Sequence, residues 1–542
     1  MACASEGIRP DGFAVSSAHP QATRAGIEIL KIGGNAFDAA IAVASALAVV
    51  EPYSSGIGGG GFFLLHVVKD DLNVFIDARE TAPKASFAEM YLDDEGEFIR
   101  SKSLTGGLAA GIPGLPAGLV YLSENFGRLD LKKNMGAAIR LAKEGFLTGE
   151  RYNAMAGYRA KDLNMFPESG RIFLDNGLAP KPGYRISQPE LARTLESIAL
   201  THGHDFYQGE IAKRLVAGVR AAGGIWSLDD LAEYRIKLRP PVTTTYRGSK
   251  VVSAPPPSSG GIVLIEALNI LERYNLSTET DINTAHLVVE AMRRAYRDRA
   301  DFLGDPDFVD IPVETLLSKS YADNIASNIS IMKASSSSEL APLESKIEGR
   351  DTTHFSIIDA DGNRVAATLS INTPFGAAVV PKGTGVILNN EMDDFSARRL
   401  TPNTYGLVGA GANSIAPGKR PLSSMTPTFI ESDDRVAILG TPGGSRIISM
   451  VLISALEFLR GGDAESMVAT KRYHHQYLPD QVNYEKGGFT ESEVSGLLGK
   501  GHKLKESSRN YGNMHVVTWE KASGKIAASS DARGEGQAIV AK

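Results

Sequence analysis

The chain has 542 residues, 43% of them apolar, which is enough to bury a large core. Its formal net charge is −6, without a block of five like charges, so its composition does not favour nucleic-acid binding. Cys3 is the single cysteine, which excludes an intrachain disulfide and a cluster of thiolate metal ligands. No apolar run reaches about 18 residues, so the sequence predicts no membrane-spanning helix.

The first residues, "MACASEGIRPDG", lack the apolar region of a secretory signal. Two interpretations follow, and the sequence leaves both open. The protein is cytoplasmic, or it is periplasmic or secreted and its signal has been removed from this sequence.

The N-terminal hundred residues predict strands and helices in alternation. Residues 12–20, "GFAVSSAHP", predict a short strand, and the helical spacing of apolar residues over 21–33 predicts the next helix. The Ala/Val-rich run 38–50 predicts a second helix, buried on all sides. Further along, 284–303 has the pattern of an amphipathic helix. No internal repeat of solenoid or propeller length is present.

A Ser-rich, weakly periodic run at 333–351 has the composition of a mobile connection. The alternating pattern that follows it predicts a β-hairpin. With Asp361 and Gly362 as the two turn residues, facing positions add up to 723, and Thr352 lies opposite Ile371. A shift of one residue brings Ser370 or Asn372 to that place instead. We therefore divide the chain into a larger α/β part, 1–351, and a smaller strand-rich part, 352–542.

Three glycines, Gly56, Gly58 and Gly61, match the spacing of a dinucleotide-binding loop. The order of elements is wrong for that function, because a helix precedes the glycines and a strand follows them. We instead expect the backbone at 58–61 to approach another strand or a substrate closely. A purely structural packing role remains an alternative.

Other catalytic patterns have little support. The chain contains no G-x-S-x-G sequence, and "PPPSSGG" at 255–261 does not match it. Of the ten histidines only His474 and His475 are adjacent, and neighbouring side chains point in different directions on a helix or strand. We therefore expect neither a serine triad nor a metal site.

Three polar clusters lie in the second part: "NNEMDDFS" at 389–396, "KRPLSSMTPTF" at 419–429 and "LGTPGGSR" at 439–446. Their simplest interpretation is that they form turns. Together with Thr352, however, they supply a hydroxyl nucleophile, carboxylates for a cation, a serine pair for an anion and glycine N–H groups for an oxyanion.

These clusters, in this order after "TTHFSIIDADGN", resemble the γ-glutamyltransferases (glutathione hydrolases), which are N-terminal nucleophile hydrolases. Earlier stretches resemble the same family, among them "DARETAP", "PPPSSGGIVLIEALNIL" and the glycine run, and the similarity extends from about Gly12 to the C-terminus. The resemblance implies an α/β (α+β) fold, a four-layer αββα sandwich. It also implies a precursor that cuts itself between Asp351 and Thr352, leaving a large subunit (1–351) and a small subunit (352–542) that build the fold jointly.

The resemblance also implies the catalytic groups. Thr352 becomes an N-terminal nucleophile, and its new α-amino group, with an ordinary pKa of about 7.7–8.0, acts as the base. Ser370 orients the nucleophile beside Asn372, and Thr368 assists processing, whereas Thr353 has no role. Gly443 and Gly444 donate N–H groups to the oxyanion.

By the same resemblance, the substrate is held by its charges. Arg79 binds the α-carboxylate together with Ser423 and Ser424, while Glu391 and Asp394 bind the α-ammonium. The loop 396–420 covers the cleft, with Tyr405 above the nucleophile, and the glycine run at 58–61 lines the cleft. The chain departs from the family in "DARGEGQAIV", which lacks the proline of a D-P-R element and leaves the packing of Arg533 open. At 391 it has glutamate, where some members have glutamine.

The expected activity is transfer of the γ-glutamyl group of glutathione, or of a similar amide, to Thr352. The group then passes to water or to an amino acid or dipeptide, and neither a metal nor an organic cofactor is needed. One alternative is a relative with another acyl group, such as a cephalosporin acylase, a poly-γ-glutamate hydrolase or an oxamate hydrolase. A second alternative is a binding protein that never undergoes processing.

Overall fold

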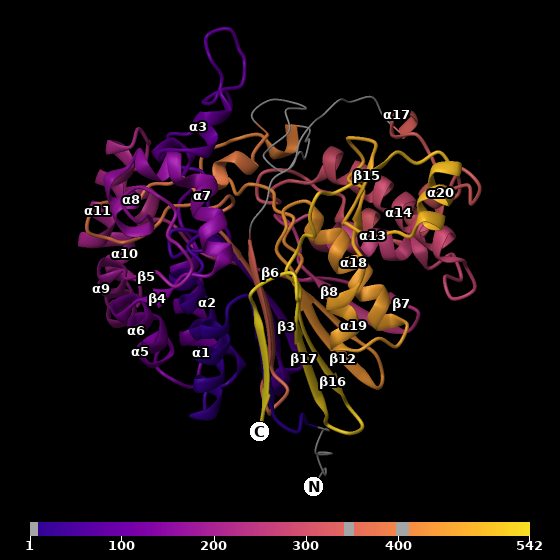
Figure 1. Ribbon diagram of the computed structural model, residues 1–542, viewed down its shortest axis with the longest axis horizontal. Helices are drawn as coiled ribbons and strands as arrows, with labels where there is room; N and C mark the ends of the chain where they lie inside the picture. Colours follow the sequence, from indigo (N-terminus) through magenta and orange to yellow (C-terminus); the bar gives the residue numbers. More distant parts are fainter. Residues whose placement is uncertain (1–8, 341–351, 397–410) are drawn as a thin grey trace.

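The protein is built from two β-sheets that lie face to face between two layers of helices (Figure 1). A computed structural model describes residues 9–340, 352–396 and 411–542. The helix–sheet–sheet–helix arrangement confirms the predicted four-layer α/β sandwich.

The first sheet has seven strands and contains the predicted hairpin at its centre. Its strands come from both parts of the chain, so neither part can form the sheet alone. In spatial order they are β18 (Gln537–Ala541), β1 (Phe13–Ser17), β9 (Thr353–Ile358), β10 (Arg364–Ser370), β2 (Gly60–Val67), β3 (Leu72–Ala78) and β6 (Lys237–Arg239).

The second sheet has six strands and is likewise shared between the two parts. Its strands are β17 (Ile526–Ser530), β16 (His515–Glu520), β12 (Arg435–Gly440), β11 (Thr428–Glu431), β8 (Ser249–Ser253) and β7 (Val242–Tyr246). Two small sheets pair β13 (Tyr473–His474), β14 (Val482–Tyr484) and β15 (Leu504–Glu506), and β4 (Phe146–Leu147) with β5 (Arg185–Ile186).

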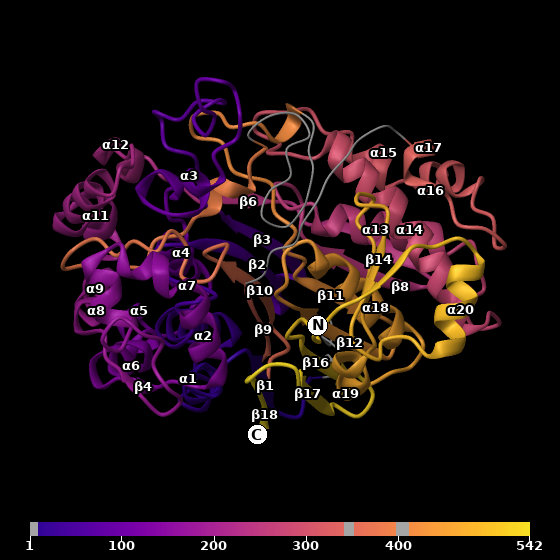
Figure 2. The ribbon, with the colours of Figure 1, turned by 45° about the horizontal axis from the view of Figure 1, so that its top comes forward.

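The helices that cover the first sheet all come from the first part of the chain (Figures 1 and 2). The helices of this side are α1 (Pro20–Lys31), α2 (Ala36–Val50), α3 (Arg100–Leu104), α4 (Leu115–Phe126), α5 (Leu131–Asn134), α6 (Gly136–Glu144), α7 (Glu150–Asn164), α8 (Pro167–Phe173), α9 (Pro189–Thr201), α10 (His204–Gln208), α11 (Glu210–Ala221) and α12 (Leu228–Ala232). Every residue of α2 is buried, as its Ala/Val-rich sequence predicts.

The helices beyond the second sheet come from both parts of the chain. They are α13 (Gly260–Leu271), α14 (Asp281–Phe302), α15 (Val313–Leu317), α16 (Lys319–Ala326), α17 (Ser337–Leu340), α18 (Arg446–Leu459), α19 (Ala464–Ala469) and α20 (Glu491–Gly499). In the part of the chain that the structure describes, no helix has both the length and the apolar character needed to cross a membrane.

Strand β2 shows how the two cores are divided. Phe63 and Leu65 belong to the core between the first sheet and its helices, whereas Phe62 and Leu64 belong to the core on the other side. Successive side chains of a strand point to opposite faces, so a strand in the interior of a sandwich is apolar throughout. This explains the continuous apolar run "FFLL" within β2.

The hairpin of β9 and β10 forms as predicted, but its register is one residue away from the prediction. Leu369 faces Thr353, so facing positions add up to 722 (369 + 353), not 723. The turn has three residues, 360–362, with Gly362 in the left-handed region at φ 93°. Asp359 stabilises it, because its carboxylate accepts hydrogen bonds from the backbone N–H groups of Asp361 and Asn363. Such a three-residue loop with glycine in the last position is a common hairpin type.

The glycine run at 58–61 packs closely against the backbone of other segments. This agrees with the expectation of a close approach to neighbouring backbone. A Cβ on Gly59 would lie 2.2 Å from the carbonyl oxygen of Ser370, and a Cβ on Gly58 would lie 2.2 Å from that of Ile387. These positions accept only glycine, because any side chain would push β2 away from its neighbours.

The Ser-rich connection is described as far as residue 340. Its first half is held to the body of the protein, because Arg293 donates to Ser337 Oγ (2.6 Å) and Arg294 donates to Ser335 Oγ (3.1 Å). The remainder, 341–351, lies outside the described residues.

Candidate active site

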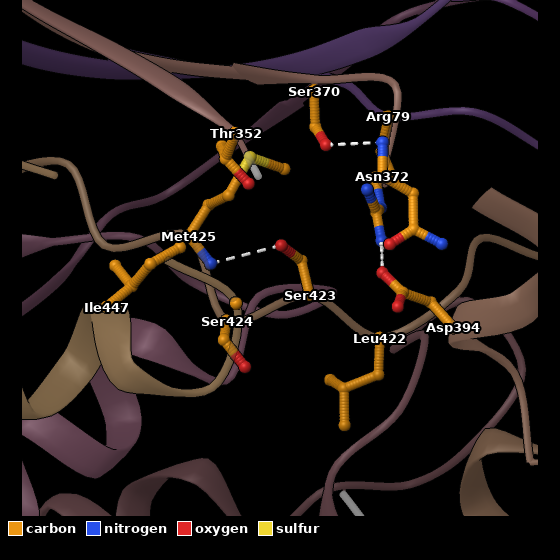
Figure 3. A pocket seen from close by; sticks show the side chains of 11 residues that line it. Arg79, Thr352, Ser370, Asn372, Asp394, Leu422, Ser423, Ser424, Met425 and Ile447 are labelled. Atoms are coloured by element: carbon orange, nitrogen blue, oxygen red, sulfur yellow. Dashed lines mark hydrogen bonds and ion pairs between the residues drawn. The ribbon is translucent and has the colours of Figure 1, made fainter. Parts of the chain in front are cut away.

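One small pocket brings together predicted residues that are widely separated in the sequence (Figure 3). Thr352 and Ser370 contribute to it from the end of the central hairpin that lies away from the turn. The pocket is lined by Arg79, Thr352, Ser370, Asn372, Asp394, Leu422, Ser423, Ser424, Met425, Gly444 and Ile447.

Thr352 and Thr353 have different surroundings although they are adjacent. Thr352 lines the pocket, directly before β9 begins. Thr353 is fully buried, and its hydroxyl donates a 2.8 Å hydrogen bond to Glu51 Oε2. Because successive side chains of a strand face opposite ways, only one of the pair can reach the pocket. Thr352 is the one that does so.

Ser370 and Asn372 lie beside Thr352 because of the hairpin register. Continued one residue beyond β9, the observed register places Thr352 opposite Ser370. The Ser370 hydroxyl accepts a 2.7 Å hydrogen bond from the backbone N–H of Asn372. Asn372 has φ 72°, and its side-chain amide donates to the carbonyl of Asn390 at 2.9 Å. Such a backbone conformation is uncommon in a residue other than glycine and is typical of functional sites.

Gly443 and Gly444 form the turn between β12 and α18. Both have positive φ angles, 140° and 58°, so the turn favours glycine. Gly444 lines the pocket, whereas Gly443 lines a neighbouring cavity together with Arg446 and Tyr511. The turn lies at the N-terminus of α18, where backbone N–H groups give a positive potential that favours a developing negative charge.

Arg79 is the centre of a buried charge network. Its side chain is 1% exposed and forms 2.6 Å ion pairs with Glu391 Oε2 and Asp394 Oδ2. Glu80 lies 3.7 Å from the same guanidinium. Three carboxyl groups therefore face one arginine, and the site carries an excess of acidic groups that a cation can balance.

Burial dominates the protonation of these acids. It raises the pKa of Glu391 to about 7 and that of Glu80 to about 8, although the Arg79 charge opposes both shifts. Burial, with Glu391 next in effect, also holds the pKa of Asp394 well above its usual range. Glu391 and Glu80 thus titrate near neutral pH, as is common for groups that bind or react.

The remaining predicted residues that the structure describes lie around the pocket without lining it. Glu391 is one contact away, behind Arg79. Thr368 is buried two residues before Ser370, and its hydroxyl is 2.8 Å from His354 Nδ1. The glycine run at 58–61 is not among the lining residues and supports β10 from behind. Asp351 and Tyr405 lie outside the described residues.

The residues predicted from the sequence did not include the apolar lining residues Leu422, Met425 and Ile447, or the buried acid Glu80. Each lies within or beside a motif that was identified, so proximity to those motifs is the signal that could have found them. Arg533, whose packing was left open, pairs with Glu485 at 2.6 Å and with Asp531 at 3.1 Å.

His286, Glu290 and His502 form a buried cluster whose ligand atoms lie within 4.8 Å of one another. The sequence did not indicate it, because His502 is distant in the chain. His286 Nδ1 and His502 Nε2 are 2.8 Å apart, and Glu290 is held at 2.7 Å by Arg294. The cluster is therefore a hydrogen-bonded network in which neighbouring arginines already neutralise the carboxylate. The adjacent pair His474 and His475 bonds to separate partners, as predicted.

Comparisons with known proteins agree with this geometry. The family model described as Gamma-glutamyltranspeptidase matches residues 22–541. A glutathione hydrolase proenzyme of Pseudomonas sp. (strain A14) is 45% identical over 88% of this chain and 83% of its own length. That of Escherichia coli (strain K12) is 41% identical over 92% and 86%, respectively.

A solved structure of cephalosporin acylase from Bacillus halodurans superposes with a TM-score of 0.85 at 27% identity, covering 99% of this chain and 97% of that one. The match of the family model over nearly the whole chain, together with relatives above 40% identity, decides the classification. The chain belongs to the gamma-glutamyltranspeptidase family.

Proposed function

We propose that this protein is a self-processing threonine hydrolase and transferase that cleaves the γ-glutamyl amide of glutathione and related compounds. The observation that carries the proposal is the placement of Thr352 in one pocket with Arg79, Asp394 and the serine pair. A γ-glutamyl group carries an α-carboxylate and an α-ammonium at one end and the reacting carbonyl at the other. The pocket offers charged groups at one end and a hydroxyl nucleophile at the other.

The first reaction of the proposed enzyme is its own cleavage. The Thr352 hydroxyl attacks the carbonyl carbon of Asp351, the peptide nitrogen leaves as the α-amino group of Thr352, and an ester is formed. Water hydrolyses the ester, which releases the Asp351 carboxylate and restores the hydroxyl. The products are a large subunit, 1–351, and a small subunit, 352–542, held together by the two shared sheets.

The new N-terminus then serves as the base. The α-amino group of Thr352 takes the proton of the hydroxyl as the oxygen attacks the γ-carbonyl. The N–H groups of the 443–444 turn stabilise the oxyanion, and the amine of the leaving group departs with a proton. The resulting γ-glutamyl ester on Thr352 passes to water or to the amine of an amino acid or dipeptide, and this acceptor step is part of the proposal.

At the charged end, Arg79 and its acidic partners would hold the donor by exchanging ion pairs with each other for ion pairs with the substrate. In the structure Arg79 is paired with Glu391 and Asp394. An entering α-ammonium takes up part of the charge of these carboxylates, and Arg79 can then share its N–H groups with the α-carboxylate. Ser423 and Ser424 supply hydroxyl donors for the same carboxylate.

The test begins with the intact mass of the purified protein under denaturing conditions. Fragments 1–351 and 352–542 are expected, followed by release of glutamate from glutathione and from γ-glutamyl-p-nitroanilide. A cut after Arg350 would indicate a contaminating protease with trypsin-like specificity, and accurate mass separates it from a cut after Asp351. An unbroken chain without turnover of either donor would refute the proposal.

The cephalosporin acylase similarity supports a second candidate, the same nucleophile acting on another acyl group. An acyl group without α-charges would leave Arg79 and its acidic partners unused. A glutaryl anilide, which lacks both α-charges, separates the two functions. Turnover of this compound at or above the rate of the γ-glutamyl anilide would favour the second candidate.

A further inference from the structure

Arg299, on α14, is a buried cation directly behind the serine pair of the pocket. Its side chain is 4% exposed. Its Nε donates a 2.9 Å hydrogen bond to Ser259 Oγ, and its Nη2 lies 3.5 Å from Ser424 Oγ. Among the described residues no carboxylate forms an ion pair with it, in contrast to Arg79 in the same region. Burial lowers the pKa of Arg299 to about 10, with smaller opposing effects from Tyr296 and Asp394.

Burial of a charge without a counter-ion is costly, so it calls for a compensating group. Two neutral hydroxyls satisfy hydrogen bonds of the guanidinium but do not balance its charge. The place where an anion could approach is the pocket itself, on the other side of Ser424, which lines it.

The segment around Ser259 fixes this arrangement. It belongs to "PPPSSGG", a motif to which the sequence analysis gave no role. Ser259 donates from both its N–H (2.8 Å) and its hydroxyl (2.7 Å) to the carbonyl of Ser423. The hydroxyl of Ser258 donates to the carbonyl of Met425 at 2.6 Å. The loop that carries the serine pair is therefore attached to the start of α13, and Arg299 is attached to the same point.

The helix start adds to the positive potential. α13 begins at Gly260 and runs for 12 residues, and the N-terminus of a helix carries partial positive charge. Arg299 and this helix end lie on the side of the pocket that holds the serines, whereas the acids Glu391 and Asp394 lie on the side of Arg79. The pocket thus has a cation and a helix N-terminus behind the serine wall, and acidic groups paired with Arg79 on the other wall, an arrangement that suits a zwitterion.

We propose that Arg299 is a positioning residue that acts through Ser259 and Ser424 to supply the positive wall for the donor's α-carboxylate, and that it sets the preference for donors carrying this group. This inference rests on the proposed γ-glutamyl function. Arg299 does not itself need to touch the substrate.

The test compares two ligands that differ only in the α-carboxylate, namely glutamate and 4-aminobutyrate, bound to the processed enzyme and measured by calorimetry. In parallel, KM and kcat are measured for the γ-glutamyl and 4-aminobutyryl anilides. The Arg299→Gln variant is expected to bind glutamate about 10- to 100-fold more weakly, the range of a charge-assisted interaction. It should raise KM for the γ-glutamyl anilide by the same factor with little change in kcat. Affinity for 4-aminobutyrate should remain within about threefold.

Two variants serve as matched references. Arg299→Lys keeps the charge and should recover most of the preference for glutamate. Arg297→Gln makes the same chemical change two residues away, where the guanidinium pairs with Asp298 instead of the pocket serines, and should leave the preference unchanged. If Arg299→Gln does not fold or process, Ser259→Ala takes its place. This variant removes the hydroxyl that orients Arg299, and it should weaken glutamate binding alone, by about threefold.

An equal loss of affinity for glutamate and for 4-aminobutyrate would show a merely structural role. An unchanged ratio of the two affinities in Arg299→Gln would refute the inference. If Ser259→Ala is used instead, an unchanged ratio in that variant has the same meaning. A different result is expected if the proposed γ-glutamyl function itself is wrong. In that case the wild-type enzyme itself would bind glutamate no better than 4-aminobutyrate and would not cleave the γ-glutamyl anilide.

Discussion

The two ends of the pocket are built in different ways. At the nucleophile end, Thr352, Ser370 and the 443–444 turn are neutral, and strand register and backbone conformation position them. At the charged end, Arg79 and its acidic partners are positioned by buried ion pairs. The first end should therefore be sensitive to changes of shape and the second to changes of charge and pH.

The largest effect is expected at the nucleophile end. Thr352→Ala should abolish both processing and turnover, with a loss of at least about a thousandfold, since an activated nucleophile acts as a unit with its base. Intact mass and anilide hydrolysis measure the two effects.

The neighbouring threonine is the control. Thr353→Val removes only the hydrogen bond to Glu51 and should cost about 1 kcal/mol in the free energy of unfolding, while processing continues. Loss of processing in this variant and retention in Thr352→Ala would reverse the assignment of the pair.

Gly59→Ala tests the shape requirement behind the same end. Its Cβ would lie 2.2 Å from the carbonyl oxygen of Ser370, so β2 and β10 must move apart. A cost of about 3 kcal/mol in the free energy of unfolding is expected, with slower processing. Thermal denaturation and a time course of intact mass measure this. Gly499→Ala, where a Cβ meets nothing within 4 Å, is the matched control and should not destabilise the protein.

Asp394→Asn tests the charged end. Loss of one carboxylate that faces the α-ammonium should raise KM for the γ-glutamyl anilide by roughly 10- to 100-fold, the range of a charge-assisted hydrogen bond. Asp393→Asn is the matched control, because Asp393 accepts a 2.6 Å hydrogen bond from Ser103 Oγ, outside the pocket. Equal effects of the two substitutions would argue against a specific ammonium site.

The last comparison concerns pH and stability. The pKa of Glu80 is raised from 4.5 to about 8 by burial, so the folded protein keeps this proton while the unfolded chain has lost it. This contribution to the free energy of unfolding is fully present below pH 4.5 and is lost as the pH rises towards 8, by about 1.4 kcal/mol per pH unit. Glu80→Gln should therefore show a smaller fall in Tm between pH 5 and pH 8. The exposed Glu95→Gln serves as control, and an unchanged fall in Glu80→Gln would contradict the protonated state.

Local patterns in the sequence predicted most of the fold. The buried helix α2, the strand β1, the helix α14 and the hairpin follow from apolar spacing and turn residues, which act over a few positions. The register of the hairpin did not follow. It depends on the three-residue turn that Asp359 stabilises through hydrogen bonds, and a one-residue difference there changes which residue faces Thr352.

Some residues of the candidate site could likewise be predicted from the sequence, and others could not. Motif resemblance identified eight of the eleven lining residues, because those motifs carry polar groups that are unusual outside a site. It could not identify the apolar lining or Glu80, whose types are common in any core. Nor could it identify Arg299, which is one of several arginines in an ordinary amphipathic helix.

The sequence by itself determined the class of fold and the family, since these depend on local patterns and on motif order, and from the same motifs it predicts where an N-terminal threonine would be exposed. Only the tertiary structure decided the pairing of Thr352 with Ser370, the shared acids around Arg79, and the burial of Arg299 away from any carboxylate partner among the described residues. The pairing of Thr352 with Ser370 depends on the hydrogen bonds of the hairpin turn. The other two features depend on distances between segments that are far apart in the sequence, and on the burial that raises or lowers each pKa. Neither quantity is encoded in any short stretch of the chain.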